Sequence, residues 1–180
     1  APVEGAVTVA AASSWSGGAI TGSGTLTFVG DLSITGAGEK VLSGGRVINT
    51  FGTTTWSGAT TTNTNDFYTG PATINNAGLW IDANAASTIV RDWYSGNALV
   101  FNNAGTYRKQ GNTTSTLEAT FHNTGTVEVQ AGVLSLSRGG SAGAEGSIRL
   151  DAGATLRFNA GTFELNDTTV TGTGTFQVAG

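Results

Sequence analysis

Residues 127–136 read VEVQAGVLSL, and residues 148–158 read IRLDAGATLRF. The Ala-Gly pair at 131–132 recurs at 152–153, with one residue inserted after it. On both sides of this pair apolar residues alternate with polar ones, which is the pattern of short, half-buried β-strands. Gly, Asn or Asp follows such runs closely, and these residue types accept the left-handed backbone of sharp corners. No window shows a helical period, so the sequence predicts an all-β chain.

A second phrase repeats upstream of the first. It reads INTFG at 48–52, INNAG at 74–78, FNNAG at 101–105 and FHNTG at 121–125, and each copy ends on a glycine. The repeated glycines are 20–27 residues apart, which is the length of one coil of a β-solenoid. A single coil can neither pair its own strands nor bury its inward side chains, so the coil must be repeated. Parallel crossovers are right-handed in the great majority of proteins. We therefore predict a right-handed parallel β-helix (β-solenoid) of about seven to eight coils, with residues 1–180 as a single domain.

The predicted stacking places particular side chains beside one another. Val127 should lie next to Ile148, and Leu134 next to Leu156. Two polar columns stand two and three residues before the repeated glycine: Asn76, Asn103 and Asn123 in one, and Asn75, Asn102 and His122 in the other. In register, such amides can hydrogen-bond from coil to coil. We expect these residues to serve as corner structure and not as metal ligands.

The composition excludes several classes of protein. Only 8 Lys and Arg stand against 12 Asp and Glu, and a net charge of −4 argues against a nucleic-acid partner. No apolar run approaches the ~20 residues of a membrane helix, so membrane insertion is not expected. Because the chain has no Cys, it has no disulfide or thiolate metal site.

The first and last parts of the chain echo each other. ITGSGTLTFVG at 20–30 is close to VTGTGTFQVAG at 170–180, and the opening APVEGAVTVA has neither an initiator Met nor the basic region of a signal peptide. We expect the chain to be a fragment of a longer repeat protein.

The repeats resemble those of a known class of proteins. FNNAGTYRKQG at 101–111, FHNTGTVEVQAGVLSLSRGG at 121–140 and DAGATLRFNAGTFEL at 151–165 look like the β-strand repeats of large bacterial secreted or surface proteins, in the style of filamentous-haemagglutinin and autotransporter-passenger segments. The resemblance implies an architecture, a bacterial secreted or cell-surface location, and the rest of a parent repeat protein as partner. It supplies no catalytic residue.

The residues offer little catalytic or metal-binding chemistry. His122 is the only histidine, and no nucleophile elbow, zinc motif or phosphate loop is present. The charged residues that a polysaccharide lyase or hydrolase would use are scattered: Arg91, Asp92, Arg108, Lys109, Glu118 and Glu128. We interpret them as outward charges on stacked strands, with Glu128 and Arg149 as a cross-strand ion pair.

Oxygen donors for calcium occur at 63–66 and 82–84, but carboxylates are too sparse for a tight site. We expect no enzyme activity, no metal and no cofactor.

Aromatic residues gather between 56 and 107, where the coil spacing lengthens. Extra residues must leave the regular wall as loops, which we place at 57–70 and 83–96, and loops are where solenoids put binding sites. Trp80 and Tyr107 fall at the inward position of Val127 and belong to the predicted core. The predicted ligand-binding residues are those that remain: Trp56, Tyr68, Trp93 and Tyr94. Aromatic faces beside polar side chains suit sugar rings.

These observations favour one function and leave others open. The first hypothesis is a non-catalytic structural or adhesive spacer, monomeric, that contacts a glycan or a host or neighbouring-cell surface. The alternatives are a carbohydrate-binding module that uses the loops around 56–107, or a polysaccharide-active enzyme. An ice-binding face would need evenly spaced Thr-x-Thr ranks, and the TTT and NTTST segments do not recur at the coil period.

Overall fold

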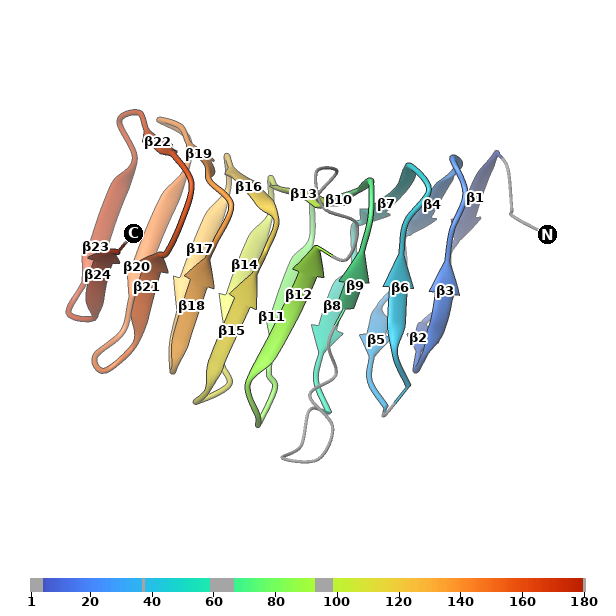
Figure 1. The fold of residues 1–180 in the computed structure, drawn as a ribbon, viewed down its shortest axis with the longest axis horizontal. Coiled ribbons are helices and arrows are strands. Elements are labelled where there is room, and N and C mark those ends of the chain that lie inside the picture. The colour runs from blue at the N-terminus through green and yellow to red at the C-terminus, as the bar shows by residue number, and fades with distance from the viewer. Residues whose placement is uncertain (1–4, 37, 59–66, 93–98, 180) are drawn as a thin grey trace.

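The computed structural model describes residues 5–36, 38–58, 67–92 and 99–179, and these form strands and turns with no helix among them. The strands make three parallel sheets of eight strands each, and every coil gives one strand to each sheet (Figure 1). The predicted parallel β-solenoid and its number of coils are confirmed. The coils follow one another along the long axis, from β1 at one end to β24 at the other.

The three sheets, named here A, B and C, take every third strand of the chain. Sheet A contains β1 (Ala6–Val9), β4 (Thr25–Phe28), β7 (Arg46–Thr50), β10 (Ala72–Asn76), β13 (Leu99–Asn103), β16 (Thr120–Asn123), β19 (Gly140–Ala142) and β22 (Phe163–Leu165). Sheet B contains β2 (Ser13–Trp15), β5 (Leu32–Ile34), β8 (Thr53–Trp56), β11 (Leu79–Asp82), β14 (Thr106–Lys109), β17 (Thr126–Val129), β20 (Ser147–Leu150) and β23 (Thr169–Gly172). Sheet C contains β3 (Gly18–Ile20), β6 (Lys40–Leu42), β9 (Phe67–Thr69), β12 (Thr88–Asp92), β15 (Thr114–Leu117), β18 (Val133–Leu136), β21 (Thr155–Phe158) and β24 (Thr175–Val178).

The register between coils is the one that the repeats predict. Val127 pairs with Ile148 in sheet B, and Leu134 pairs with Leu156 in sheet C. All four side chains are buried, since the alternation within each strand sends every second residue into the interior. Neighbouring coils therefore share both their backbone hydrogen bonds and their core.

The interior is a stack of apolar and aromatic side chains. In sheet A, Phe101 of β13 lies in register with Phe121 of β16, and their rings stack with centroids 5.4 Å apart. The rings of Trp80 and Tyr107, both buried as predicted, meet the ring of Phe101 edge to face at 5.1 and 5.6 Å. Such ring pairs add roughly 0.5–1.5 kcal/mol each beyond the area that they bury.

The repeated glycine of the second phrase is required by close packing between coils. A Cβ atom on Gly105 would lie only 2.1 Å from the carbonyl oxygen of Gly78, one coil away. No side chain fits in that space, so this corner of every coil in the series needs glycine.

The two predicted polar columns form hydrogen-bonded ladders. In the buried inner ladder, Asn76 Nδ2 donates to Asn103 Oδ1 at 2.8 Å, and Asn103 Nδ2 donates to Asn123 Oδ1 at 2.7 Å. In the half-buried outer ladder, Asn102 Nδ2 donates to Asn75 Oδ1 at 2.8 Å, and Asn75 in turn donates to Asn49. His122 continues the outer column, where its Nδ1 hydrogen-bonds to the hydroxyl of Ser141 at 2.8 Å.

One sequence similarity has no structural counterpart, and one predicted ion pair is wrong. The similar segments 20–30 and 170–180 are not equivalent in the fold, because the first supplies β4 of sheet A and the second supplies β24 of sheet C. Glu128 and Arg149 are register partners, as predicted, but each has its ion pair elsewhere. Glu128 pairs with Arg108 at 2.6 Å, and Arg149 pairs with Asp151 at 2.7 Å.

Candidate functional site

The four residues predicted to bind a ligand do not share one surface. Trp56 ends β8 with its ring in the interior, 1% exposed, in edge-to-face contact with Phe67 at 5.3 Å. The expected exposure of Trp56 is therefore wrong. Tyr68 points to the outer face of sheet C and is half-buried. Trp93 and Tyr94 lie outside the described residues.

The sequence held a signal for the burial of Trp56. Residues Thr53–Trp56 alternate outward and inward, with Thr54 and Trp56 buried. Register places Trp56 beside Asp82, and Asp82 beside Lys109, which is in turn the partner of Val129. Counting by coil length thus assigns Trp56 to the inward position of Val129, by the same reasoning that places Trp80 with Val127.

The predicted loops are shorter than expected, because each contains a strand. The segment 57–70 includes β9, and the segment 83–96 includes β12, with Phe67 and Val90 buried. The added residues that lie outside these strands fall at 59–66, before β9, and at 93–98, after β12. Residues 59–66 and 93–98 lie outside the described residues, and the strands next to them in the chain, β9 and β12, are neighbours in sheet C.

The outer face of β9 and β12 is the part of this surface that the structure describes. Tyr68 is the register partner of Val41 on one side and of Arg91 on the other, and all three are half-buried. This row, an aromatic ring between a cation and an aliphatic side chain, is here called the Tyr68 row. An aromatic ring beside a guanidinium is a combination that recognises sugar hydroxyls and apolar sugar faces.

Charged groups gather at the end of β12, one residue beyond the Tyr68 row. The Asp92 backbone nitrogen donates to Glu118 Oε2 at 3.0 Å, and the Asp92 carboxylate forms an ion pair with Arg138. The Asp92 side chain is only 4% exposed, and its Oδ1 atom has no hydrogen-bond partner. Asp92 and Glu118 are thus brought together, whereas Arg108 and Glu128 neutralise each other on sheet B.

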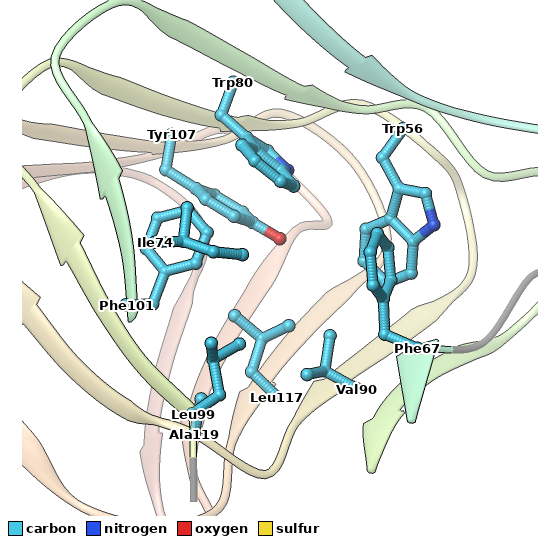
Figure 2. A pocket seen from close by; sticks show the side chains of 10 residues that line it. All are labelled: Trp56, Phe67, Ile74, Trp80, Val90, Leu99, Phe101, Tyr107, Leu117 and Ala119. Carbon is cyan, nitrogen blue, oxygen red and sulfur yellow. The ribbon is translucent and has the colours of Figure 1, made fainter. Parts of the chain in front are cut away.

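The interior between the two insertions leaves no room for a ligand. Figure 2 shows the side chains that line this part of the core, and they converge on one another from all three sheets. The cavity among them is about 10 Å³ and is lined by apolar and aromatic side chains: Trp56, Phe67, Ile74, Trp80, Val90, Leu99, Phe101, Tyr107, Leu117 and Ala119. A space of this size is at the lower limit for one water molecule, so this part of the core cannot hold a ligand.

A buried polar cluster lies where β11 and β14 end, and the sequence did not predict it. It consists of Asp82, Asn84, Tyr107 and Lys109, each 0% exposed. Burial lowers the pKa of the Lys109 amine, and the nearby Asp82 carboxylate partly opposes this shift. Burial, followed by the charge and hydrogen bond of Asp82, raises the pKa of the Tyr107 phenol well above its ordinary value.

This cluster corrects one expectation and shows the contacts of the segment 82–84. Lys109 does not point outward, because it occupies an inward position of β14. In the segment 82–84 the two polar side chains contact each other, since Asn84 Nδ2 donates to Asp82 Oδ1 at 3.2 Å. The other candidate calcium segment, 63–66, lies outside the described residues. Among residues 5–36, 38–58, 67–92 and 99–179, no group of three or more His, Asp or Glu side chains could hold a metal ion.

Comparison with known proteins gives no relative. No protein-family model matches the sequence, and neither a curated protein nor a solved structure matches it. In the part of the chain that the structure describes, no helix is long and apolar enough to cross a membrane.

Proposed function

We propose that the chain is a non-catalytic structural spacer of a large bacterial secreted or cell-surface protein, in the style of filamentous-haemagglutinin and autotransporter-passenger segments. The observation that carries the proposal is the unbroken pairing of eight strands in each of three parallel sheets. Each coil touches only its neighbours, so such a domain holds its two ends apart along one axis.

The interior supports the same proposal. Its side chains stack in columns from coil to coil, and the core leaves a cavity of only about 10 Å³ between the longest coils. A closely packed apolar core contributes stability along the length of a rod.

Single-molecule pulling on the two ends of the domain tests the spacer proposal. We expect resistance to extension, followed by unfolding in discrete steps of one or a few coils, because each coil is held by its neighbours. Two neighbouring residues of β16 give a matched pair of variants: Phe121→Ala removes a buried ring, and His122→Ala changes only the outer face. The first should lower the unfolding force and the second should not. Smooth extension without steps in the unmodified domain would contradict the proposal.

A second candidate function is carbohydrate binding at the Tyr68 row. It is favoured by the length of the connections before β9 and after β12 and by the register pairing of Tyr68 with Arg91. A glycan array followed by a binding isotherm tests it, with Tyr68→Ala as the variant and Phe51→Ala as the control, because Phe51 is 56% exposed and lies at a different corner. Binding that Tyr68→Ala weakens by tenfold or more, and Phe51→Ala leaves unchanged, would support a sugar site. The absence of binding to any glycan would leave the spacer function alone, and a lyase and hydrolase screen on acidic polysaccharides decides whether catalysis must be added.

A further inference from the structure

The two ends of the solenoid expose apolar side chains that the inner coils cover. Figure 1 shows β1, β2 and β3 at one end and β22, β23 and β24 at the other, and each of these six strands has a sheet partner on one side only. Seven large apolar side chains are exposed among the described residues, and five of them belong to these strands: Val7, Leu165, Val170, Phe176 and Val178. Exposed apolar surface is thus concentrated where a further coil would stack.

The six terminal strands lack the features that keep open sheet edges apart. Natural edge strands commonly carry lysine, proline or inward charges, or are covered by another segment. The strands here read AVTV, SSW and GAI at one end and FEL, TVTG and TFQV at the other, with Glu164 as the one charged residue among them. The backbone N–H and C=O groups on the outer side of each end are therefore able to pair with strands of another chain.

The first and last coils have corners of the same length. Three residues join sheet A to sheet B at 10–12 and at 166–168, and two residues join sheet B to sheet C at 16–17 and at 173–174. By the strand bounds given above, none of the six coils between them combines these two lengths. Because the length of a corner decides where the next strand lies, the last coil of one molecule and the first coil of another can stack with all three sheets aligned.

The side chains at the two ends are complementary in size. Register partners followed from coil to coil lead from Trp15 to Gly172 in one column of sheet B. In sheet C they lead from Gly18 to Val178, which is 76% exposed. A Cβ atom on Gly18 would meet no atom of the described residues within 4 Å, so this end of the column has room for a side chain. When the two ends meet, each of these columns places a large side chain against a glycine.

The columns of sheet A finish on apolar side chains at both ends. They lead from Val7 to Phe163 and from Val9 to Leu165. Phe163, Leu165 and Val178 also border a hollow of about 360 Å³ in the last coil. Apolar side chains of another coil would fill this hollow favourably, since the contact removes apolar surface from water.

We propose that the occupant of each end is a second copy of this chain, and that the molecules associate head to tail into a filament. The first coil of one molecule then stacks on the last coil of another, sheet upon the same sheet, with the parallel pairing of every junction within the chain. Each side contributes one coil of about 20 residues, at the lower end of what each partner gives to a standard protein interface. Because the contact joins two different surfaces, every assembly keeps free ends and can grow.

Contact between two identical ends would not reproduce this geometry. A two-fold axis across the solenoid makes the strands of the two molecules antiparallel and lets only one sheet meet its own copy, with the other two sheets exchanged. Corners of unequal length then face each other, because the corner from sheet C to sheet A at 159–162 has four residues and the other two corners of the last coil have three and two. Head-to-tail stacking is the arrangement that matches all three sheets.

Sedimentation velocity and light scattering of the purified domain over a range of concentrations test the proposal. We expect species without a preferred size that lengthen with concentration, and unbranched filaments in electron micrographs. Val178→Lys should lower the association constant by about tenfold or more, because it places an unpaired charge in the contact. Val29→Lys is the matched control, since Val29 is 50% exposed at a side corner, and it should leave assembly unchanged. A domain that remains monomeric throughout, as expected from the sequence, would overturn the proposal and leave the ends to a different chain.

Variants at opposite ends distinguish this contact from other modes of association. Val7 lies in the first coil and is 38% exposed, so Val7→Lys blocks one end and Val178→Lys blocks the other. Each variant alone should be monomeric at concentrations where the unmodified domain assembles, with circular dichroism used to select folded samples. An equimolar mixture should form dimers that do not grow, because each dimer keeps two blocked ends. Association of either variant with itself would indicate contact between identical ends and overturn the proposal.

Disulfide cross-linking tests the register without adding a charge. The chain has no cysteine, and one column of sheet B leads from Ser13 to Val170. In the filament the two Cα atoms would lie about 4.8 Å apart, within the range that a disulfide spans, whereas in one molecule they are separated by seven coil spacings, roughly 34 Å. Mild oxidation should therefore link Ser13→Cys, Val170→Cys molecules into covalent chains. The double variant Ser13→Cys, Val178→Cys, with its sites in different sheets, should not cross-link. Equal cross-linking of both double variants, or none of either, would overturn the proposal.

Discussion

Replacing Asn103 by Ala tests how much the inner ladder contributes to stability. Asn103 is 1% exposed, accepts a hydrogen bond from Asn76, and donates to Asn123 Oδ1 at 2.7 Å and to the Thr126 carbonyl oxygen at 2.9 Å. Three hydrogen bonds are lost, each worth about 1 kcal/mol, and leaving Asn123 Oδ1 buried without this donor adds roughly 1–3 kcal/mol. We expect the free energy of unfolding to fall by about 4–6 kcal/mol.

The outer ladder supplies a matched control for this prediction. Asn102 is the preceding residue on β13, is only half-buried, and donates to Asn75 Oδ1 at 2.8 Å. Water can replace that bond, so Asn102→Ala should cost less than about 1 kcal/mol. Urea unfolding followed by both circular dichroism and tryptophan fluorescence gives the two values and shows whether the transition is cooperative. If Asn103→Ala and Asn102→Ala lower the free energy of unfolding equally, burial does not make the inner ladder more stabilising than the outer one, and the prediction is wrong.

The same packing leads to three further predictions. Gly105→Ala puts a Cβ atom 2.1 Å from the Gly78 carbonyl oxygen and should destabilise the domain by at least ~2 kcal/mol, measured by urea unfolding, whereas an effect below ~0.5 kcal/mol would show that the coils can move apart. Phe101→Ala removes a ring that contacts three other rings and should cost about 3–5 kcal/mol in the same assay. The pKa of Tyr107 is raised in the folded chain, so its contribution to stability is present below its ordinary value of 10.0 and is lost as the pH rises above that value towards the folded pKa. The unfolding free energy of the unmodified chain should therefore fall more steeply in alkali than that of Tyr107→Phe, and parallel curves would contradict this.

The coil-to-coil register could be predicted from the sequence because it depends on a local rule. Side chains of a parallel stack repeat at the coil length, so the partner of Val127 is found by counting one coil forward to Ile148. The Asn ladders follow from the same count, and the residue types specify the hydrogen bonds. In a stack of repeats the residues at equivalent positions of neighbouring coils are also the residues in contact, so the sequence pattern gives the contacts directly.

The buried charges could not be predicted in this way, because their environment comes from neighbouring coils. Alternation within TYRK places Lys109 on the same side as Tyr107, yet a lone lysine is seldom fully buried. The opposite charge that partly offsets its burial comes from Asp82, its register partner on the preceding coil. The prediction that Trp56 is exposed is wrong for a related reason. The longer coil spacing predicts a loop from this point, whereas Trp56 is the last residue of β8 and its ring is buried.

The inner ladder also explains which corner of the coil has constant length. Where sheet A gives way to sheet B, the corner contains two residues in four successive coils: 51–52, 77–78, 104–105 and 124–125. In each of these coils the strand ends on a hydrogen-bonding side chain of the inner column: Thr50, Asn76, Asn103 or Asn123. The register partners at the two ends of the column are Phe28 and Ala142, which cannot donate a side-chain hydrogen bond.

At those two ends the corner lengthens to three residues, 29–31, and to four residues, 143–146. The amides also bond to the backbone just beyond the corner, since Asn76 Nδ2 reaches the Thr106 carbonyl and Asn103 Nδ2 reaches the Thr126 carbonyl. Each of these amides bonds both to the side chain of the next coil and to the backbone after its corner. A residue added at the corner would therefore break hydrogen bonds on two coils. The longest connections in the chain, between β8 and β9 and between β12 and β13, fall at the other two corners, where the described residues form no such ladder of amides, and the register is held at the corner between sheets A and B.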